Sequence, residues 1–313
     1  MKLIVQIPCL NEEKTLPRVL EDIPRSIEGF STVEVLVVDD GSSDDTVEVA
    51  QELGVEHIIR LQRRRGLAHA FSRGLEESVR RGADVIVNTD GDNQYRGQDI
   101  AKLARAVLEG EAQLIVGCRD IVHHNEFSRS KKFLQILGSS LVSYLSGLNV
   151  PDATSGFRAY SREAALRLTI HSSFSYTIET LLQAQAKRIS VGYKEISVNE
   201  KTRESRLFSS VAEYLLKSGL TIVRVVTAYN PIKVFTSIGA MSFFLGFLIG
   251  LRFLYYLIVL GEGSGKIQSL ILVAILTVIG VQGILVGLLA DATRQNRLIS
   301  EELLYSEKEG LVR

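Results

Sequence analysis

The amino-acid sequence predicts an α/β domain with a Rossmann-like, mostly parallel sheet, followed by amphipathic helices and a two-helix transmembrane hairpin. In the N-terminal two thirds of the chain, short β-branched apolar runs alternate with segments of helical periodicity. This alternation is typical of a parallel sheet covered by helices on both faces. Two long apolar segments, nearly free of charge, follow residue 231. Each exceeds the ~20 residues that a helix needs to cross a bilayer.

Composition excludes some classes of partner. The 313 residues, 46% of them hydrophobic, are enough for one large domain or two smaller ones. The 36 basic residues balance the 36 acidic ones, which argues against nucleic-acid binding through net charge. The apolar run at the N-terminus is too short for a signal peptide, so we expect the N-terminal domain to stay in the cytoplasm.

Three signals place the elements of the first half: β-branched runs for strands, leucines and valines at helical spacing, and Asp, Gly or Pro at the boundaries. The first strand stops before Pro8, which begins a loop, and the second ends on Asp39 and Asp40, while Asp44 or Asp45 can cap the helix that follows. On these signals we expect strands at residues 3–7, 33–38, 55–61 and 85–87, and helices at residues 14–26, 44–53 and 67–81. We interpret this half as nucleotide-binding.

The same signals continue beyond residue 95, with longer polar interruptions. Residues 121–130 are polar and without periodicity, and we expect a surface loop there. Arg119 leaves its strand at the same sheet edge as the residues that follow the strand at 85–87. The expected elements are helices at about residues 97–108, 130–146, 163–168 and 175–187, and strands at residues 114–117 and 191–198.

The most informative stretch is Asp90-Gly91-Asp92-Asn93-Gln94, directly after a buried apolar run. Ligands of open α/β sheets bind at the carboxyl ends of the strands. Two carboxylates one residue apart, with an amide beyond them, can supply oxygen ligands to one hard cation such as Mg²⁺ or Mn²⁺. The same residues also suit a plain turn. The other motifs of the chain therefore decide between the two interpretations.

A second motif, residues 39–46, begins with two aspartates at the end of a strand. Asp40 could accept a hydrogen bond from a base or ribose, or this segment could be a turn that caps the next helix. Arg63-Arg64-Arg65-Gly66 precedes a further helix and could face a diphosphate, although a solvated run of charge is favoured.

These two motifs, together with Thr154-Ser155-Gly156-Phe157-Arg158, resemble the family-2 glycosyltransferases, in the branch of the dolichol-phosphate mannose synthase and polyprenyl-phosphate glycosyltransferase type. The resemblance covers about residues 1–230 and implies a GT-A catalytic domain over residues 1–207. It departs from the family pattern near residues 201–207, where Glu204 and Arg206 stand in place of the usual Gly and Lys.

The resemblance implies a nucleotide-sugar donor, held with a divalent metal. It assigns Asp90, Asp92 and Gln94 to the metal, which would be Mg²⁺ or Mn²⁺. It assigns Pro8, Leu10, Asn11, Glu12, Asp40, Asp90 and Gly91 to the nucleotide sugar.

The resemblance also implies a polyprenyl-phosphate acceptor, dolichyl or undecaprenyl, and a single inverting displacement. A phosphate monoester is already anionic because its second pKa is ~6, so no strong general base is required. Cationic groups must position it, and the acceptor-phosphate candidates are Arg119, Arg129, Lys131 and Arg158. Asp92 or Glu179 could orient sugar hydroxyls. The candidate catalytic residues are Asp92, Arg119, Arg158 and Glu179.

Beyond residue 207 the composition changes toward membrane attachment. We expect an amphipathic interfacial region at residues 208–231, transmembrane helices at about 232–260 and 267–290, and a C-terminal tail at 291–313. Basic residues flank the hairpin on the side of both termini, which places these termini in the cytoplasm. Gly-x-x-x-Gly steps at Gly246 and Gly250, and at Gly283 and Gly287, permit close helix packing, with the packing face left open. Hairpin packing also makes a homo-oligomer plausible.

Two other functions compete with this interpretation. One is transfer to a sugar hydroxyl or polysaccharide synthesis, which would need a carboxylate base and, for a synthase, a longer membrane part. The other is a non-catalytic, membrane-anchored protein that binds nucleotide sugars. Metal-dependent turnover of the donor would discriminate the second from an enzyme.

Overall fold

The computed structural model describes residues 1–119, 138–140, 142–143, 147–170, 176–199, 219–220, 223, 227, 229–261 and 267–310. Its contacts form two compact units, Met1–Ile222 with Glu301–Arg313, and Val223–Ser300, and each unit is described by itself. Most of the helix expected at residues 130–146 and most of the interfacial region lie outside the described residues. Arg129 and Lys131 lie outside them as well.

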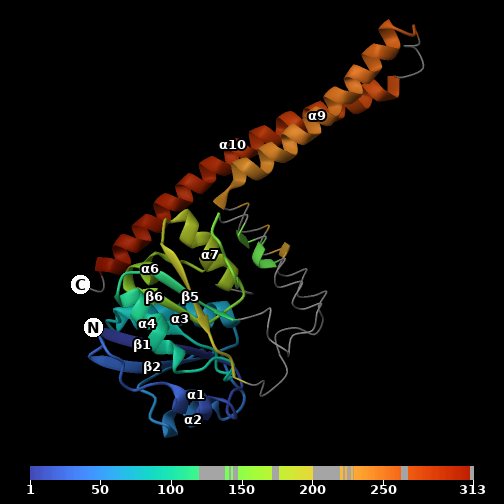
Figure 1. The fold of residues 1–313 in the computed structure, drawn as a ribbon. Helices are drawn as coiled ribbons and strands as arrows, with labels where there is room; N and C mark the ends of the chain where they lie inside the picture. The colour runs from blue at the N-terminus through green and yellow to red at the C-terminus, as the bar shows by residue number, and fades with distance from the viewer. Residues whose placement is uncertain are drawn as a thin grey trace. The chain divides into compact units, whose positions relative to one another are not determined.

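The first unit contains one seven-stranded sheet of strand order β3-β2-β1-β4-β6-β5-β7 (Figure 1). Neighbouring strands run parallel, except that β6 is antiparallel to both β4 and β5. The mostly parallel sheet is therefore confirmed. The strands are β1 Lys2–Cys9, β2 Thr32–Asp39, β3 His57–Arg60, β4 Val85–Asn88, β5 Leu114–Arg119, β6 Arg158–Ser161 and β7 Val191–Ile196.

Strand β6 was not expected from the sequence, where its residues belong to a predicted loop. It is only four residues long, and it starts with an arginine and ends with a serine, so it lacks the apolar run that marks the other strands. Its register places Arg158 opposite Asn88 on one side and Val116 on the other. Because β6 runs antiparallel, the loop that precedes it arrives at the carboxyl ends of β4 and β5.

Helices cover both faces of the sheet (Figure 1). On one face, α1 and α4 bury Leu16, Leu20 and Leu103 in a core with alternate residues of the strands. On the other face, α3 packs on β1 and β2 and contacts α6 and α7. The helices of this unit are α1 Leu16–Asp22, α2 Thr46–Glu52, α3 Leu67–Arg80, α4 Asp99–Leu108, α6 Arg162–Arg167 and α7 Tyr176–Ala186.

Most boundaries fall close to those expected from the sequence. Helix α1 ends at Asp22 rather than near residue 26, and the next residue, Ile23, is extended. The cause is Pro24, because the residue before a proline is sterically kept out of the helical region.

The second unit contains α9, Pro231–Ile258, and most of α10, Ile267–Gly310. Both helices are long and apolar enough to cross a membrane, and large hydrophobic side chains on them are exposed. Helix α10 continues past residue 290, where the apolar segment ends. Exposure of this kind is costly in water and natural in lipid.

Small residues bring α9 and α10 close together. A Cβ atom added at Gly239 would lie 2.7 Å from the carbonyl oxygen of Gly280, and one at Gly246 would lie 3.1 Å from Leu276 Cβ. Gly250, by contrast, is in ordinary contact with Val273. The close face is therefore built around Gly239, Gly246, Gly280 and Gly283, the last of which would place a Cβ atom 3.0 Å from the Cα atom of Gly239. Of the two predicted Gly-x-x-x-Gly steps, the one that starts at Gly283 lies closer to the partner helix at both of its glycines, while Gly250 in the other is in looser contact.

Candidate active site

The candidate site lies at the carboxyl ends of β1, β2, β4 and β5. The segment after β4 forms a turn, because the backbone N–H of Gln94 donates to Asp92 Oδ1 at 3.1 Å and Asn93 has a φ of 59°. The turn interpretation is thus locally correct, and it does not exclude a ligand role. It presents Asp90 and Asp92 side by side at the sheet edge.

Asp90 is half-buried, and within the described part of the chain its carboxylate has no hydrogen-bond or ion-pair partner. Burial, the neighbouring charge of Asp92 and the charge of Glu12 raise the pKa of Asp90 to about 7, while Arg119 and Arg158 oppose the shift. Two carboxylates that repel each other in a partly desolvated place are stabilised by a cation. Oxygen donors of this kind fit Mg²⁺ or Mn²⁺.

The described residues contain no group of three His, Cys, Asp or Glu side chains arranged for a metal ion. Mg²⁺ commonly binds through one or two carboxylates and completes its coordination with water and substrate phosphates. The pair Asp90 and Asp92, with Gln94 two residues beyond, therefore remains a reasonable metal site. Gln94 itself also donates its backbone to the turn described above.

The predicted donor-side residues after β1 are drawn toward the loops after β2 and β4. Asn11 accepts a hydrogen bond from the N–H of Ser43 at 2.8 Å and donates its own N–H to Ser42 Oγ at 2.8 Å. A Cβ atom at Gly91 would lie 3.1 Å from Cys9 Sγ and 3.2 Å from Glu12 Cγ. Glycine at position 91 allows this close approach of the turn after β4 to Cys9 and Glu12.

Pro8 belongs to β1 rather than to the loop after it. The pairing of β1 with β4 ends at Gln6 and Asn88, so Pro8 lies past the last pair and its missing N–H interrupts no ladder on that side. Leu10 follows directly after β1 and is half-buried. Roles of Pro8 and Leu10 in donor binding stay predictions.

Asp40 anchors the start of α3. Its Oδ1 accepts from the N–H of Arg65 and its Oδ2 from the N–H of Gly66, both at 2.8 Å, and Asp40 is only 3% exposed. The two amides that could have faced a diphosphate are thus bound within the protein, while the side chains of residues 63–65 are exposed. Contact between Asp40 and a nucleotide stays a prediction.

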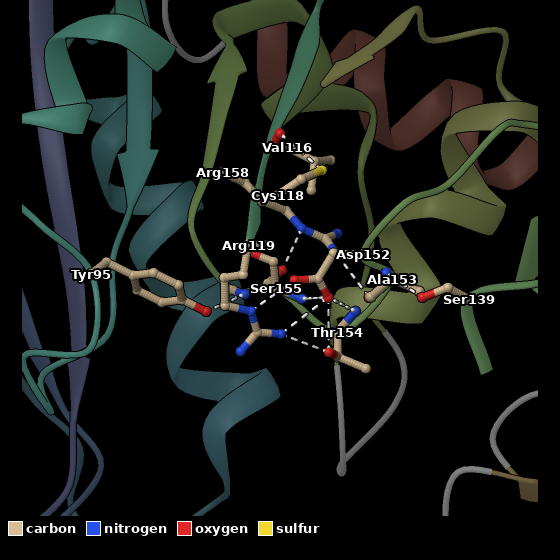
Figure 2. A network of polar contacts seen from close by, with 11 residues as sticks. Tyr95, Val116, Cys118, Arg119, Ser139, Asp152, Ala153, Thr154, Ser155 and Arg158 are labelled. Carbon is tan, nitrogen blue, oxygen red and sulfur yellow. Dashed lines mark hydrogen bonds and ion pairs between the residues drawn. The ribbon is translucent and has the colours of Figure 1, made fainter. Parts of the chain in front are cut away.

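Arg119, a predicted ligand of the acceptor phosphate, forms a bidentate ion pair with Asp152 (Figure 2). The Nε–Oδ2 distance is 2.7 Å and the Nη2–Oδ1 distance is 3.0 Å, and Nη2 also donates to Thr154 Oγ1 at 2.8 Å. Although burial alone would raise it, the charge and hydrogen bonds of Arg119 hold the pKa of Asp152 below its usual range. Arg119 is therefore a fixed cation at the sheet edge, with an 8% exposed side chain.

Arg158 is fully buried and holds the loop that precedes it. Its Nε donates to the carbonyl of Ser155 at 2.8 Å, and Nη2 donates to the carbonyl of Ala153 at 3.1 Å. Its Nη1 donates to the carbonyl of Thr177 at 2.8 Å and to Thr180 Oγ1. With every guanidinium nitrogen engaged and no exposed surface, Arg158 braces the loop at residues 152–157, the predicted acceptor-side loop, against α7. This geometry favours a positioning role over direct phosphate contact.

Gly156 lies where the acceptor-side loop meets the residues around Asp90. Its N–H donates to Tyr95 Oη at 3.1 Å, and its carbonyl accepts from Asn88 Nδ2 at 2.8 Å and from Tyr176 Oη at 3.3 Å. A Cβ atom at Gly156 would lie 2.7 Å from Tyr176 Oη and 3.0 Å from both carboxylate oxygens of Asp90. The motif that follows β4 and the motif that precedes β6 are therefore in direct contact.

Glu179 is 2% exposed on α7, so it is not an ordinary exposed carboxylate on a helix surface. Its Oε1 accepts from Gln183 Nε2 at 3.1 Å. It follows Tyr176 by one helical turn, which places it on the same side of α7. A role for Glu179 toward the sugar stays a prediction.

No role was expected from the sequence for Asn88, Tyr95, Asp152 or Tyr176, although each lies within a predicted motif or helix. A buried asparagine at the end of an apolar strand is a usable signal, because a buried amide must find partners. The tyrosines carry no such signal, since tyrosine is common in cores.

Residues 4–169 match the family model described as glycosyl transferase family 2, which is more than half of the chain. The chain belongs to glycosyl transferase family 2. The family membership expected from the three motifs is thereby confirmed, and this family-2 protein is a glycosyltransferase.

This family-2 chain is 28% identical over 216 residues to an undecaprenyl-phosphate mannosyltransferase of Micrococcus luteus, with 65% of this chain and 85% of that protein covered. It is 27% identical over 208 residues to a UDP-N-acetylglucosamine–dolichyl-phosphate N-acetylglucosaminyltransferase of Methanococcus voltae, with 59% and 81% covered. The two relatives differ in sugar and in lipid, so family-2 membership alone does not fix either.

Its fold is similar to that of glucosyl-3-phosphoglycerate synthase from Mycobacterium tuberculosis in complex with Mn²⁺, uridine diphosphate and glucosyl-3-phosphoglycerate. The TM-score is 0.58 at 21% identity, covering 73% of this chain and 79% of that one. At this identity the likeness shows the fold alone, and it confirms the GT-A architecture.

Proposed function

We propose that the protein transfers a hexose from a nucleoside diphosphate sugar, GDP-mannose or a UDP-sugar such as UDP-glucose, to a membrane polyprenyl phosphate. The product would be a lipid-phosphate-linked sugar for glycan or cell-envelope assembly. The observation that carries the proposal is the contact between the carboxylate of Asp90 and Gly156. It puts a candidate donor-metal ligand beside the loop assigned to the acceptor. The two relatives from Micrococcus luteus and Methanococcus voltae are named as transferases to polyprenyl phosphates, and this supports the acceptor class.

In the proposed reaction, a phosphate oxygen of the acceptor attacks the anomeric carbon, and the bond from that carbon to the nucleoside diphosphate breaks with inversion. A divalent cation, Mg²⁺ or Mn²⁺, held by Asp90, Asp92 and Gln94, would supply neutralisation of the charge that grows on the departing diphosphate. The acceptor oxygen is anionic at neutral pH, so the protein needs to position it rather than to deprotonate it.

Cationic side chains would position the acceptor phosphate. Arg119 is the described candidate, because it is fixed by Asp152 at the sheet edge and its charge reaches Asp90. Arg129 and Lys131, outside the described residues, follow Arg119 closely in sequence and stay acceptor-phosphate candidates. Arg158 is assigned to bracing the loop, and Asp92 or Glu179 to the sugar hydroxyls.

The two apolar helices suit a lipid acceptor, because they would hold the catalytic domain beside the bilayer in which that acceptor resides. We propose an integral membrane protein with a catalytic domain at residues 1–207, an interfacial region at 208–231, a hairpin at 232–290 and a tail at 291–313. By the distribution of basic residues, the catalytic domain and both termini face the cytoplasm.

A donor screen tests the proposal. Purified full-length protein in detergent would be incubated with Mn²⁺ or Mg²⁺, a short polyprenyl phosphate and a panel of UDP- and GDP-sugars, and lipid-linked product would be measured. We expect product from one donor, lost on chelation and in the Asp92→Asn variant. Metal-dependent nucleotide binding without lipid product from any donor would exclude the lipid phosphate and favour a hydroxyl acceptor or a non-catalytic role.

A further inference from the structure

Tyr95 lies between the segment that begins at Asp90 and the loop that contains Gly156, and it has no role in the proposed chemistry. It follows Gln94 at the end of the segment that begins at Asp90, and it is 5% exposed. Its hydroxyl accepts the N–H of Gly156 at 3.1 Å, and its ring stacks on Phe157 with centroids 5.0 Å apart and planes 15° from parallel. Figure 2 shows the hydroxyl pointing into the network of Arg119, Asp152 and Ser155.

The backbone around Tyr95 is fixed from the other side by the residues that follow β7. Tyr95 pairs with Val198 in an isolated antiparallel bridge, and the N–H of Asn199 donates to the carbonyl of Gln94 at 2.9 Å. The side chain of Asn199 also donates to the carbonyl of Asn93 at 3.1 Å. Residues 93–95 are therefore held on one side, and the Tyr95 side chain reaches across to the loop at residues 152–157.

The hydrogen bond between the Tyr95 hydroxyl and the Gly156 N–H can pass a movement of one segment to the other. The N–H of Gly156 is a buried backbone donor, and such a donor must find an acceptor. A displacement of the segment at residues 90–95 therefore moves the acceptor of this bond, and the Gly156 peptide must follow or lose its partner. The carbonyl of the same residue accepts from Asn88 Nδ2, so Gly156 is held on both sides and the loop has little freedom to adjust in another way.

We propose that Tyr95 is a positioning residue that couples the donor-side segment, residues 90–95, to the acceptor-side loop, residues 152–157. Binding of metal and nucleotide at the first orders the second through the Tyr95 hydroxyl. The inference rests on the proposed function, which identifies the donor and the acceptor. The coupling itself is a property of the two segments and can be measured without any acceptor.

Hydrogen exchange of the full-length protein in detergent tests the coupling, with Mn²⁺ and either UDP or GDP as the probe. We expect the nucleotide to slow amide exchange in peptides spanning residues 88–95 and 150–160 of the wild type. In Tyr95→Phe, which keeps the ring stack and removes only the hydroxyl, slowing should persist at 88–95 and disappear at 150–160. Equal slowing of both peptides in Tyr95→Phe would overturn the proposal.

Tyr193→Phe is the matched control. Tyr193 on β7 has a buried hydroxyl for which the described residues offer no hydrogen-bond partner, so this variant should retain the wild-type coupling. Phe157→Leu weakens the ring stack and keeps the hydroxyl. It should reduce the coupling less than Tyr95→Phe does, and it provides a second variant should Tyr95→Phe fold poorly. A larger loss of coupling in Phe157→Leu than in Tyr95→Phe would assign the coupling to the ring stack and contradict the proposed role of the Tyr95 hydroxyl.

Steady-state kinetics add a readout that a purely structural role would not separate. For Tyr95→Phe we expect the KM for the polyprenyl phosphate to rise about tenfold, as for loss of one buried hydrogen bond, with the donor KM nearly unchanged. Parallel rises in both KM values would contradict the proposal. If the wild type gives no lipid product, the proposed function fails, while the exchange experiment still decides the role of Tyr95.

Discussion

The guanidinium of Arg119 and the carboxylate of Asp152 meet in two parallel hydrogen bonds at the carboxyl end of β5. Asp152 is fully buried, and its Oδ1 also accepts the backbone N–H groups of Thr154 and Ser155, both at 3.1 Å. One carboxylate thus fixes both the cation and the first turn of the acceptor-side loop. The pair links β5 to the segment that enters β6.

Replacing Asp152 with Asn should destabilise the protein by about 3 kcal/mol, because it leaves the buried charge of Arg119 without its counterion. We also expect transfer activity to fall, since the loop at residues 152–155 loses its anchor. Circular-dichroism melting and lipid-product assays in detergent measure the two effects. Glu76→Gln is the control: its ion pair with Arg73 is solvent-exposed, so a change below about 0.5 kcal/mol is expected. Equal effects in the two variants would contradict the assignment.

The same pair predicts an acid-dependent loss of stability. The pKa of Asp152 is lowered in the folded protein, so its contribution is fully present above the unfolded value of about 3.9. The contribution is lost as pH falls through the lowered folded pKa, because the unfolded state then takes up the proton more readily. The stability gap between wild type and Asp152→Asn should therefore narrow in acid, as measured by denaturant unfolding from neutral pH down to about 3. A stability difference between the two proteins that does not change with pH would show that the ion pair is not its source.

The core strands are well predicted from the sequence because a strand buried on both faces requires a continuous apolar run. Residues 33–38 and 85–87 are continuous apolar runs, and a parallel strand between two helical layers requires them. Family motifs add the positions of Asp90, Asp92 and Gly156. These features are local in the sequence, so no knowledge of topology is needed to find them.

The environment of Arg158 could not be predicted in the same way. An arginine in a loop-like motif indicates a phosphate ligand, but here it starts an antiparallel strand that β4 and β5 enclose. Its partners, the carbonyl of Thr177 and the hydroxyl of Thr180, lie about twenty positions away on α7. The tertiary fold brings α7 to the start of β6, and a single sequence does not state that arrangement.

Gly156→Ala should impair both folding and transfer. The added methyl would fall within 3.0 Å of Asp90 and 2.7 Å of Tyr176 Oη, so the loop or α7 must shift, at about 1–3 kcal/mol for overpacking. Melting and product formation measure the loss. Gly138→Ala is the matched control, because a Cβ there would meet no atom within 4 Å in the described part of the chain. Wild-type turnover in Gly156→Ala would show that the close approach is unimportant.

Asp92→Asn should separate stability from activity. In the absence of metal, the variant should be at least as stable as the wild type, because one of two repelling carboxylates is neutralised. Mn²⁺ should raise the melting temperature of the wild type and leave that of the variant nearly unchanged. Turnover should fall by about a hundredfold or more, as for loss of a strong electrostatic stabiliser of the departing group. Glu109→Gln, an exposed acidic position after α4, should behave as the wild type in all three assays.

The membrane hairpin offers a prediction independent of the catalytic domain. Gly239→Val would push a side chain into the backbone of α10, because its Cβ would lie 2.7 Å from the carbonyl oxygen of Gly280. The helices must then separate, and close packing is what drives helix association in lipid. We expect loss of about 1–3 kcal/mol of stability in detergent, measured by thermal melting of the helical circular-dichroism signal.

Gly250→Val is the control, since the nearest methyl of Val273 would lie 3.7 Å from its Cβ. The donor KM should be unchanged in both variants, because every donor-site candidate lies in the first unit. Equal melting of the two variants would show that Gly239 is not at the packing face.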